Sequence, residues 1–400
     1  NDLSSTFRPG AQPFEGKLPL GMLSAKLAAG NAWSLEGFMA YEHRGNVYPG
    51  CGTYFDVASF IAGGCNMISF AAPAAIEQAK LNSGAYVHRN PDVRPNSTKH
   101  FGLNYGFKSQ ALDADLKLYA MNTTSVAPSY RMTVNTTTGG TGATNYGLMY
   151  PENVSVFGVS FNKKLNAELS SYGEIAYRPN QSISFNANDL LSALIATDAN
   201  KPATLLGLRK QIQSVPVGGT FDAYDRFGVI TGSVGLSKIF PKALNADRVT
   251  VTTEVGFSHI NSLPSQDMLR FGRGTAYGAA AYTKADGTST ACTETVGGKQ
   301  CTTDGYTSSN AWGVRLMASA TYPNALAGAT LTPSLYVAKD IKGYSYDGTF
   351  SEGRSVVRPS IRADWGNKYF ADVQYNRFSG GNYNLLVDRS YLSLVGGMRF

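Results

Sequence analysis

Apolar and polar residues alternate along much of this chain with a period of two. In residues 101–108, Phe, Leu, Tyr and Phe take every second position, and Gly, Asn, Gly and Lys lie between them. Successive side chains of a β-strand point to opposite faces, so the pattern predicts a strand with one apolar and one polar face. Counting from residue 19 gives about thirteen such strands. Clear examples are residues 33–42, 249–258, 312–322, 357–365 and 369–376.

A soluble β-sandwich also alternates in this way, so other features must separate the two folds. The strands run for about ten to twelve residues, the length that a tilted transmembrane strand needs. Aromatic residues such as Trp33, Trp312, Trp365 and Tyr369 lie near strand ends, as they do at the two interfaces of a membrane. We therefore expect an all-β fold, a transmembrane antiparallel up-and-down β-barrel in the bacterial outer membrane.

The connections between the strands supply a second test. Short links near residues 29–31, 111–113, 165–166, 241–246, 323–328 and 366–367 alternate with long ones at 44–97, 124–152, 181–225, 261–309, 342–352 and 379–388. Outer-membrane barrels have short periplasmic turns and long external loops. We therefore expect a single barrel over residues 1–400, with residues 44–97, 124–152, 181–225 and 261–309 as extracellular loops.

The two ends of the chain bear on the strand count. Leu392, Leu394, Gly396, Met398 and Phe400 share one face of the last predicted strand, which resembles the terminal assembly signal of outer-membrane barrels. Bacterial single-chain barrels have an even number of strands. We therefore expect about fourteen strands, with residues 2–8 as the fourteenth, or further strands that precede residue 1.

Composition narrows the class of protein. Only 16% of the residues are charged, which is low for a soluble surface of this size. The apolar stretches are far shorter than the roughly 18 to 20 residues of a spanning helix, which excludes a helical membrane protein. The net charge of +7 comes without a basic run, so we expect no nucleic-acid partner. The expected surroundings are outer-membrane lipid and lipopolysaccharide.

The four cysteines fall into two close pairs, Cys51 with Cys65 and Cys292 with Cys301, each in a predicted external loop. Disulfides are the favoured interpretation, because neither pair has the Cys-x-x-Cys spacing or the histidine of a metal site. The sequence contains no hydrolase elbow, zinc-protease motif or phosphate-binding loop. We therefore expect neither an enzyme nor a cofactor nor a metal.

Charged residues are predicted on the inner, lumen face of the barrel. Arg354, Arg358 and Arg362 recur every four residues and, with Arg315, form a basic ladder. One interpretation is that the ladder steers anions or lipid headgroups. The favoured one is that these arginines pair with carboxylates and stiffen a filled barrel. The predicted lumen carboxylates are Glu174, Asp364 and Asp372.

Two long loops contain apolar segments that predict short helices, residues 69–82 and 189–213. Asn188 or Asp189 is expected to cap the first helix of the second segment, and Pro202 to begin its second. These helices either pack together over the barrel mouth, which is favoured, or form a vestibule that captures an apolar ligand. The residues in question are Leu190, Leu191, Leu194, Ile195, Leu205 and Leu208.

Several phrases carry a family resemblance. They are PGA at 9–11, SLEGF at 34–38, CGTYF at 51–55, YPEN at 150–153, GVSFN at 158–162, GEIAYRPN at 173–180, KDIKGYS at 339–345 and FSEGR at 350–354. In this order they resemble the outer-membrane family catalogued as domain of unknown function 1302. The resemblance implies a genetic setting beside a resistance-nodulation-division type transporter and a periplasmic protein similar to lipoprotein carriers.

Taken together, these features predict a transport component for lipidic or hydrophobic compounds, with a hydrophobic small molecule or lipid as ligand. The periplasmic carrier and the inner-membrane transporter are its expected partners. Two alternatives remain open, a general or anion-preferring diffusion porin and a structural or surface-interaction barrel.

Overall fold

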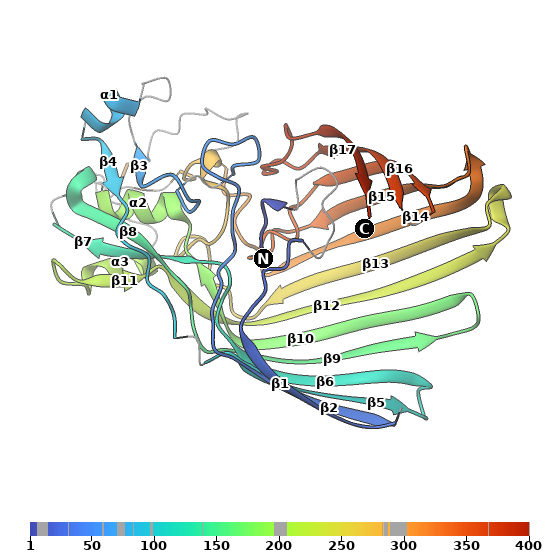
Figure 1. Ribbon diagram of the computed structural model, residues 1–400. Helices are drawn as coiled ribbons and strands as arrows, with labels where there is room; N and C mark the ends of the chain where they lie inside the picture. The colour runs from blue at the N-terminus through green and yellow to red at the C-terminus, as the bar shows by residue number, and fades with distance from the viewer. Residues whose placement is uncertain are drawn as a thin grey trace.

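The computed structural model describes every residue except 6–14, 31, 58–59, 70–76, 83, 97–98, 138, 196–205, 282, 284–286, 289–301, 367 and 400. Within these limits the chain is built mainly from antiparallel strands (Figure 1). No helix in the described part is both long enough and apolar enough to cross a membrane.

One antiparallel sheet of thirteen strands dominates the fold. Its strands, in spatial order, are β1 (Met22–Ala29), β2 (Trp33–Ala40), β5 (Phe101–Ser109), β6 (Ala114–Thr123), β9 (Val154–Lys164), β10 (Leu169–Ser184), β12 (Tyr224–Pro241), β13 (Arg248–Ile260), β14 (Asn310–Leu326), β15 (Ala329–Lys342), β16 (Ser355–Trp365), β17 (Tyr369–Ser379) and β18 (Tyr391–Met398). The spatial order of the strands in this sheet is the same as their order in the sequence, so each strand pairs with the strand that follows it in the list. The sheet curves into a trough, with β1 and β18 as its two ends (Figure 1).

Of the fourteenth strand expected at residues 2–8, the described residues 2–5 are not part of this sheet. Asp2 makes only an isolated bridge to Val47, and residues 6–14 lie outside the described part of the chain. The amino-terminal ammonium of Asn1 donates to Asn46 Oδ1 at 3.2 Å, so residues 1–5 lie against the connection after β2. The count of thirteen alternating strands from the sequence agrees with the sheet.

The two faces of the sheet differ as the alternation predicts. Register pairs such as Leu23–Met39 and Met39–Phe101 place apolar side chains on one shared face, where these three are about half exposed or more. The opposite, concave face carries the polar set. Other exposed apolar side chains of the outer face are Leu27, Leu35, Leu103, Leu118, Phe157, Ile175, Val234, Leu236, Val255, Leu316, Leu335, Ile361, Val373, Leu392 and Leu394.

Short and long connections alternate around the sheet, as predicted, and the long ones contain elements of their own. We call residues 41–100, 124–153, 185–223 and 261–309 the cap. Its elements gather at one end of the sheet in Figure 1. They are β3 (Met67–Ser69), α1 (Glu77–Asn82), β4 (Tyr86–His88), β7 (Ser129–Val134), β8 (Thr144–Met149), α2 (Ala187–Ile195), α3 (Leu206–Gln213) and β11 (Thr220–Asp222). Short 3₁₀ turns in the described part of the chain include Thr141–Ala143, Ala243–Asn245 and Thr275–Tyr277.

The structure adds detail to the predicted loops. Residues 124–152 contain the β7–β8 hairpin, which joins β11 in a small sheet of its own. Of the helix expected over 69–82, the structure describes α1 at Glu77–Asn82; Ser69 belongs to β3, and residues 70–76 lie outside the described residues. The strands β10 (Leu169–Ser184) and β12 (Tyr224–Pro241) extend a few residues into the region 181–225 that was expected to be a long connection with short helices.

Candidate functional site

The predicted lumen charges lie on the concave face. Arg315 pairs in register with Glu254, Arg362 with Asp372, and Asp364 with Phe370, all on the face opposite the exposed apolar set. The alternation within each strand therefore placed these side chains correctly. Their partners, however, differ in part from those expected.

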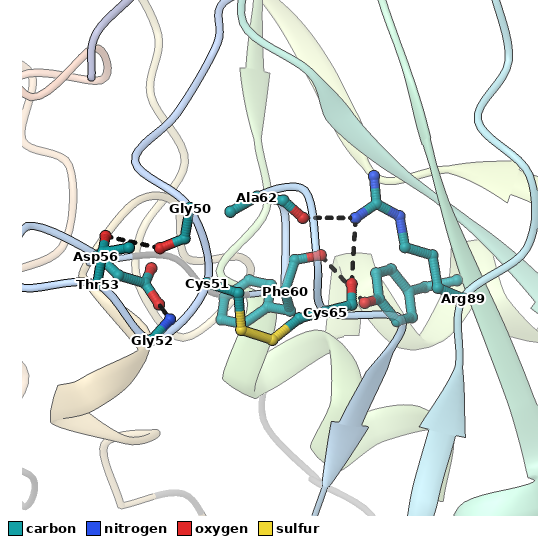
Figure 2. The surroundings of a disulfide bond; sticks show 10 residues. Gly50, Cys51, Gly52, Thr53, Asp56, Phe60, Ala62, Cys65 and Arg89 are labelled. Carbon is teal, nitrogen blue, oxygen red and sulfur yellow. Dashed lines mark hydrogen bonds between the residues drawn. A yellow bond between two sulfur atoms is a disulfide. The ribbon is translucent and has the colours of Figure 1, made fainter. Parts of the chain in front are cut away.

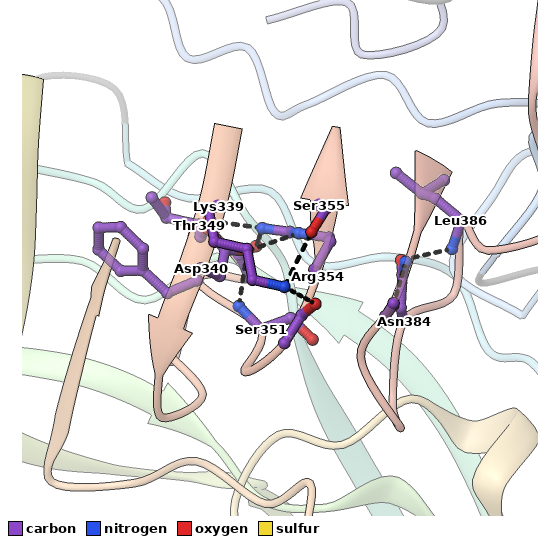
Figure 3. A network of polar contacts seen from close by, with 12 residues as sticks. Lys339, Asp340, Thr349, Ser351, Arg354, Ser355, Asn384 and Leu386 are labelled. Carbon is purple, nitrogen blue, oxygen red and sulfur yellow. Dashed lines mark hydrogen bonds and ion pairs between the residues drawn. The ribbon is translucent and has the colours of Figure 1, made fainter. Parts of the chain in front are cut away.

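Asp340, at the end of β15, is the central carboxylate of this region, and the sequence did not single it out as a site residue. Its side chain is 2% exposed and lies between two arginines. Arg315 Nη2 donates to Oδ1 at 2.7 Å and Arg354 Nε to Oδ2 at 2.7 Å. The backbone N–H of Ser351 also donates to Oδ2, at 3.0 Å (Figure 3).

Two members of the basic ladder thus hold the segment between β15 and β16. Besides binding Asp340, Arg354 Nη2 donates to the carbonyl oxygens of Gly348 at 3.2 Å and Thr349 at 2.6 Å. Arg315 and Arg354 are paired, as the favoured interpretation requires, but with Asp340 instead of Glu174 or Asp372. The reason is that the chain folds back after β15, which brings Arg354 beside the end of that strand.

The other two ladder arginines also have partners. Arg358 Nε donates to Asn376 Oδ1 at 2.6 Å, and Arg362 pairs with Asp364 at 2.9 Å. Arg362 also lies over the ring of Phe370, with its guanidinium carbon 4.4 Å from the ring centroid. These two arginines therefore stiffen the inner faces of β16 and β17.

The five apolar loop residues that the structure describes pack inside the cap. Leu190, Leu191, Leu194 and Leu208 are buried in the core of the cap, and Ile195 packs against the same core. Leu205 lies outside the described residues, as does the proposed start of the second helix at Pro202. Burial of α2 between the cap strands and the ends of β10, β12 and β13 explains why its apolar face needs no ligand to cover it.

The amino-terminal cap of α2 also differs from the prediction. Asn186 precedes the helix, and its Oδ1 accepts the N–H of Asp189 at 3.0 Å. The side chain of Asp189 is instead used in a buried ion pair with Arg270, in which Arg270 Nε and Nη2 donate to the two carboxylate oxygens at 2.8 and 2.7 Å. Burial raises the pKa of Asp189 to about 6, and Arg270 opposes that shift.

Arg270 connects α2 to the loop after β13. Its guanidinium carbon lies 5.0 Å from the centroid of Tyr306, and that of Arg273 lies 4.9 Å from the same ring. Arg273 also lies 4.9 Å from the ring of Tyr383, in the connection before β18. No pattern in the sequence predicts this cluster, because Asp189, the two arginines with Tyr306, and Tyr383 come from three separate connections.

The first predicted disulfide is present. Cys51 and Cys65 are joined in the first connection of the cap (Figure 2). Next to it, Arg89 Nη1 donates to the carbonyl oxygens of Ala62 at 3.0 Å and Cys65 at 3.4 Å, which ties the bridged loop to β4. The second predicted pair, Cys292 and Cys301, lies outside the described residues.

A cavity of about 680 Å³, which we call the upper cavity, lies between the cap and the concave face of the sheet. About half of the residues around it are apolar or aromatic; most of the others are serine, threonine or glycine, and a few are charged. Pockets that bind small ligands likewise combine apolar walls with polar groups that fix the orientation of the ligand. Representative lining residues are Phe60, Tyr130, Ile183, Leu385, Arg178 and Asp347.

A second cavity of about 270 Å³, the lower cavity, lies against the inner faces of β10, β12 and β13. Glu174, the third predicted lumen carboxylate, lines it together with Glu254. Arg178, Tyr346 and Asp347 line both cavities. Burial raises the pKa of Tyr346 to about 12, so its hydroxyl is neutral at physiological pH.

Comparison with known proteins adds a family and a distant structural neighbour. No curated protein matches the chain. Among solved structures, the toluene transporter TodX of Pseudomonas putida matches with 9% sequence identity and a TM-score of 0.31, over 75% of this chain and 73% of TodX. So loose a similarity carries no argument about this chain. The profile of the family described as "Protein of unknown function (DUF1302)" matches residues 1–400, and the chain therefore belongs to that family.

Proposed function

We propose that the chain is an outer-membrane β-barrel that carries lipidic or hydrophobic compounds across the membrane. The thirteen-stranded sheet presents an exposed apolar face, which suits a lipid environment and would be costly in water. On this proposal the sheet closes into one barrel domain and the cap lies outside the cell. The oxidised Cys51–Cys65 pair is compatible with that compartment.

The upper cavity is the main reason for proposing a lipid or hydrocarbon as the ligand. Its volume of about 680 Å³ suits a molecule of lipid or drug size. Apolar side chains would cover an acyl chain or hydrocarbon, and Arg178 would face a polar end group. Tyr130 adds a phenol that stays protonated, because burial raises its pKa far above the usual range.

A binding experiment tests the proposal. The purified protein in detergent is titrated with a spin-labelled C18 fatty acid, and the immobilised fraction is measured by electron paramagnetic resonance. Ala127 is exposed and lines the cavity, so Ala127→Trp should fill the space and weaken binding by about tenfold or more. Ala111→Trp, at the exposed link between β5 and β6, is the matched control and should bind as wild type does.

The proposal fails if the protein binds no fatty acid and, in liposomes, lets small hydrophilic solutes through freely. That pair of results would favour the diffusion porin. The carrier and inner-membrane transporter that the family resemblance implies are the partners we propose for the periplasmic side. A pull-down with the purified periplasmic carrier, with and without the barrel's short turns intact, would test that part.

A further inference from the structure

Residues 343–354, between β15 and β16, form a tight hairpin. The N–H of Ser345 donates to Phe350 O at 3.0 Å, and that of Gly348 donates to Ser345 O at 3.2 Å. Tyr344 and Ser351 form an isolated antiparallel bridge below these bonds. The connection therefore has a defined shape with its tip at residues 346–349.

This hairpin lies over the concave face of the sheet. Phe350 is buried, and its ring faces Gly256 on β13, where an added Cβ would lie 3.2 Å from the ring. In the sheet, β14 separates β13 from β15, so the hairpin crosses the inner face of β14. Its tip continues to Arg178 on β10, since Tyr346, Asp347 and Arg178 line the same two cavities.

The root of the hairpin is fixed by Asp340. Its carboxylate binds Arg315, Arg354 and the Ser351 amide, and its backbone N–H donates to Arg354 O at 2.9 Å. The register shifts between the pairs Trp312–Lys342 and Gly313–Asp340, so a β-bulge lies here. Bulges bend a strand and re-aim side chains, which fits a strand end that turns into the trough.

We infer that residues 343–354 are a constriction loop, and that Arg178, Tyr346 and Asp347 form the filter between the upper and lower cavities. The inference rests on the proposed transport function and adds the residues that select what passes. Any solute moving from one cavity to the other meets one guanidinium, one carboxylate and one phenol. Charged side chains at the narrowest point of a pore determine which ions pass it.

Planar-bilayer recording in a KCl gradient tests the filter. Arg178→Gln should shift the reversal potential towards cation preference, and Asp347→Asn should shift it towards anion preference. A unit charge about 5 Å from a passing ion changes the permeability of each ion by about fourfold, in opposite directions for cation and anion, so their ratio changes by about 16-fold. Asp388→Asn is the matched control, because it removes an equally charged but exposed carboxylate in the connection before β18, and it should give the wild-type reversal potential.

Two further variants test the loop itself. Trimming the tip with Tyr346→Gly and Asp347→Gly should raise the conductance by at least about twofold, or open a channel if the wild type is silent. Asp340→Asn should increase the open-channel noise, because the arginines that hold the hairpin lose their carboxylate. Equal conductance and equal reversal potential in wild type and all four variants, whether measurable or zero, would overturn the inference.

The result is separable from the test of the proposed function. If the variants change the conductance but the protein binds no fatty acid, the constriction loop is supported and the proposed lipid ligand is rejected. If the protein binds fatty acid but none of the four variants changes the conductance or the reversal potential, the lipid ligand is supported and the constriction loop is rejected.

Discussion

Removal of the Asp189 carboxylate should loosen the cap strongly. Asp189 and Arg270 have side chains that are 2% and 3% exposed, and two hydrogen bonds of 2.7 and 2.8 Å join them. Breaking such a pair leaves a buried charge without a partner and costs about 3–5 kcal/mol. Because about 1.4 kcal/mol is a factor of ten, Asp189→Ala should raise the opening equilibrium constant of α2 by about 10² to 10⁴.

Hydrogen exchange of the Leu190 amide measures that opening, since its N–H donates at 3.0 Å to the carbonyl oxygen of Asn186, the residue before α2. Asp222→Ala is the matched control in the cap. It breaks another bidentate pair, with Arg131, whose side chains are about a third exposed, and should cost about 1 kcal/mol or less.

The raised pKa of Asp189 shows that desolvation of the buried carboxylate is costly. Replacing both partners with apolar residues, Asp189→Leu and Arg270→Met, should therefore restore wild-type protection or exceed it. The reasoning would be refuted if Asp189→Ala changed the exchange rate by less than about tenfold, or if Asp222→Ala changed it as much.

Three further predictions concern other parts of the molecule. Reducing the Cys51–Cys65 bond, which closes a loop with a sequence separation of 14, should cost the cap about 3 kcal/mol, measured by hydrogen exchange with and without reductant. Leu335→Lys on the outer face of β15 should destabilise the protein in bilayers by about 2–4 kcal/mol in urea titrations, whereas Ser334→Lys on the inner face should cost much less. Partial burial raises the pKa of Glu152, but the Asn96 amide and Lys99 lower it, and the net shift is downward. Protection of the Asn96 amide from hydrogen exchange should therefore be full above about pH 4.5 and lost at lower pH. The variant Glu152→Gln should lack this pH dependence.

The sheet was largely predictable because its strands obey one local rule. In β14, the alternation placed Trp312, Val314 and Leu316 outward, and the register pairs these residues with Phe257, Val255 and Thr253 of the outer face. A strand with one apolar and one polar face can be recognised from its own residues, without information about the neighbouring strands. The same rule located the short turns, since the period breaks at both ends of each strand.

The cap was not predictable in the same way. The hairpin β7–β8 is stabilised by the burial of Met132, Val134 and Tyr146 against α2 and the ends of β10 and β13. Those contacts join connections that are far apart in sequence, so no local period reports them. The identity of Asp189 as an ion-pair partner was missed for the same reason, because Arg270 lies 81 residues away.

The four-residue spacing that suggested a basic ladder predicts the face on which each arginine lies. It does not predict whether a nearby carboxylate neutralises the positive charge of that arginine. Arg315, Arg354 and Arg362 each pair with a carboxylate, and Arg358 binds an amide. Arg178 was not part of the ladder, yet its Nη1 donates to the neutral hydroxyl of Thr231 at 3.0 Å, at the point where both cavities meet. An arginine with a neutral partner keeps more of its field than one beside a carboxylate, because opposite charges a few ångströms apart largely cancel at a distance. The electrostatic effect on a passing solute should therefore come from Arg178 and from Asp347, the carboxylate of the filter, and not from the ladder. The ladder arginines serve mainly to hold the constriction loop and the strands behind it.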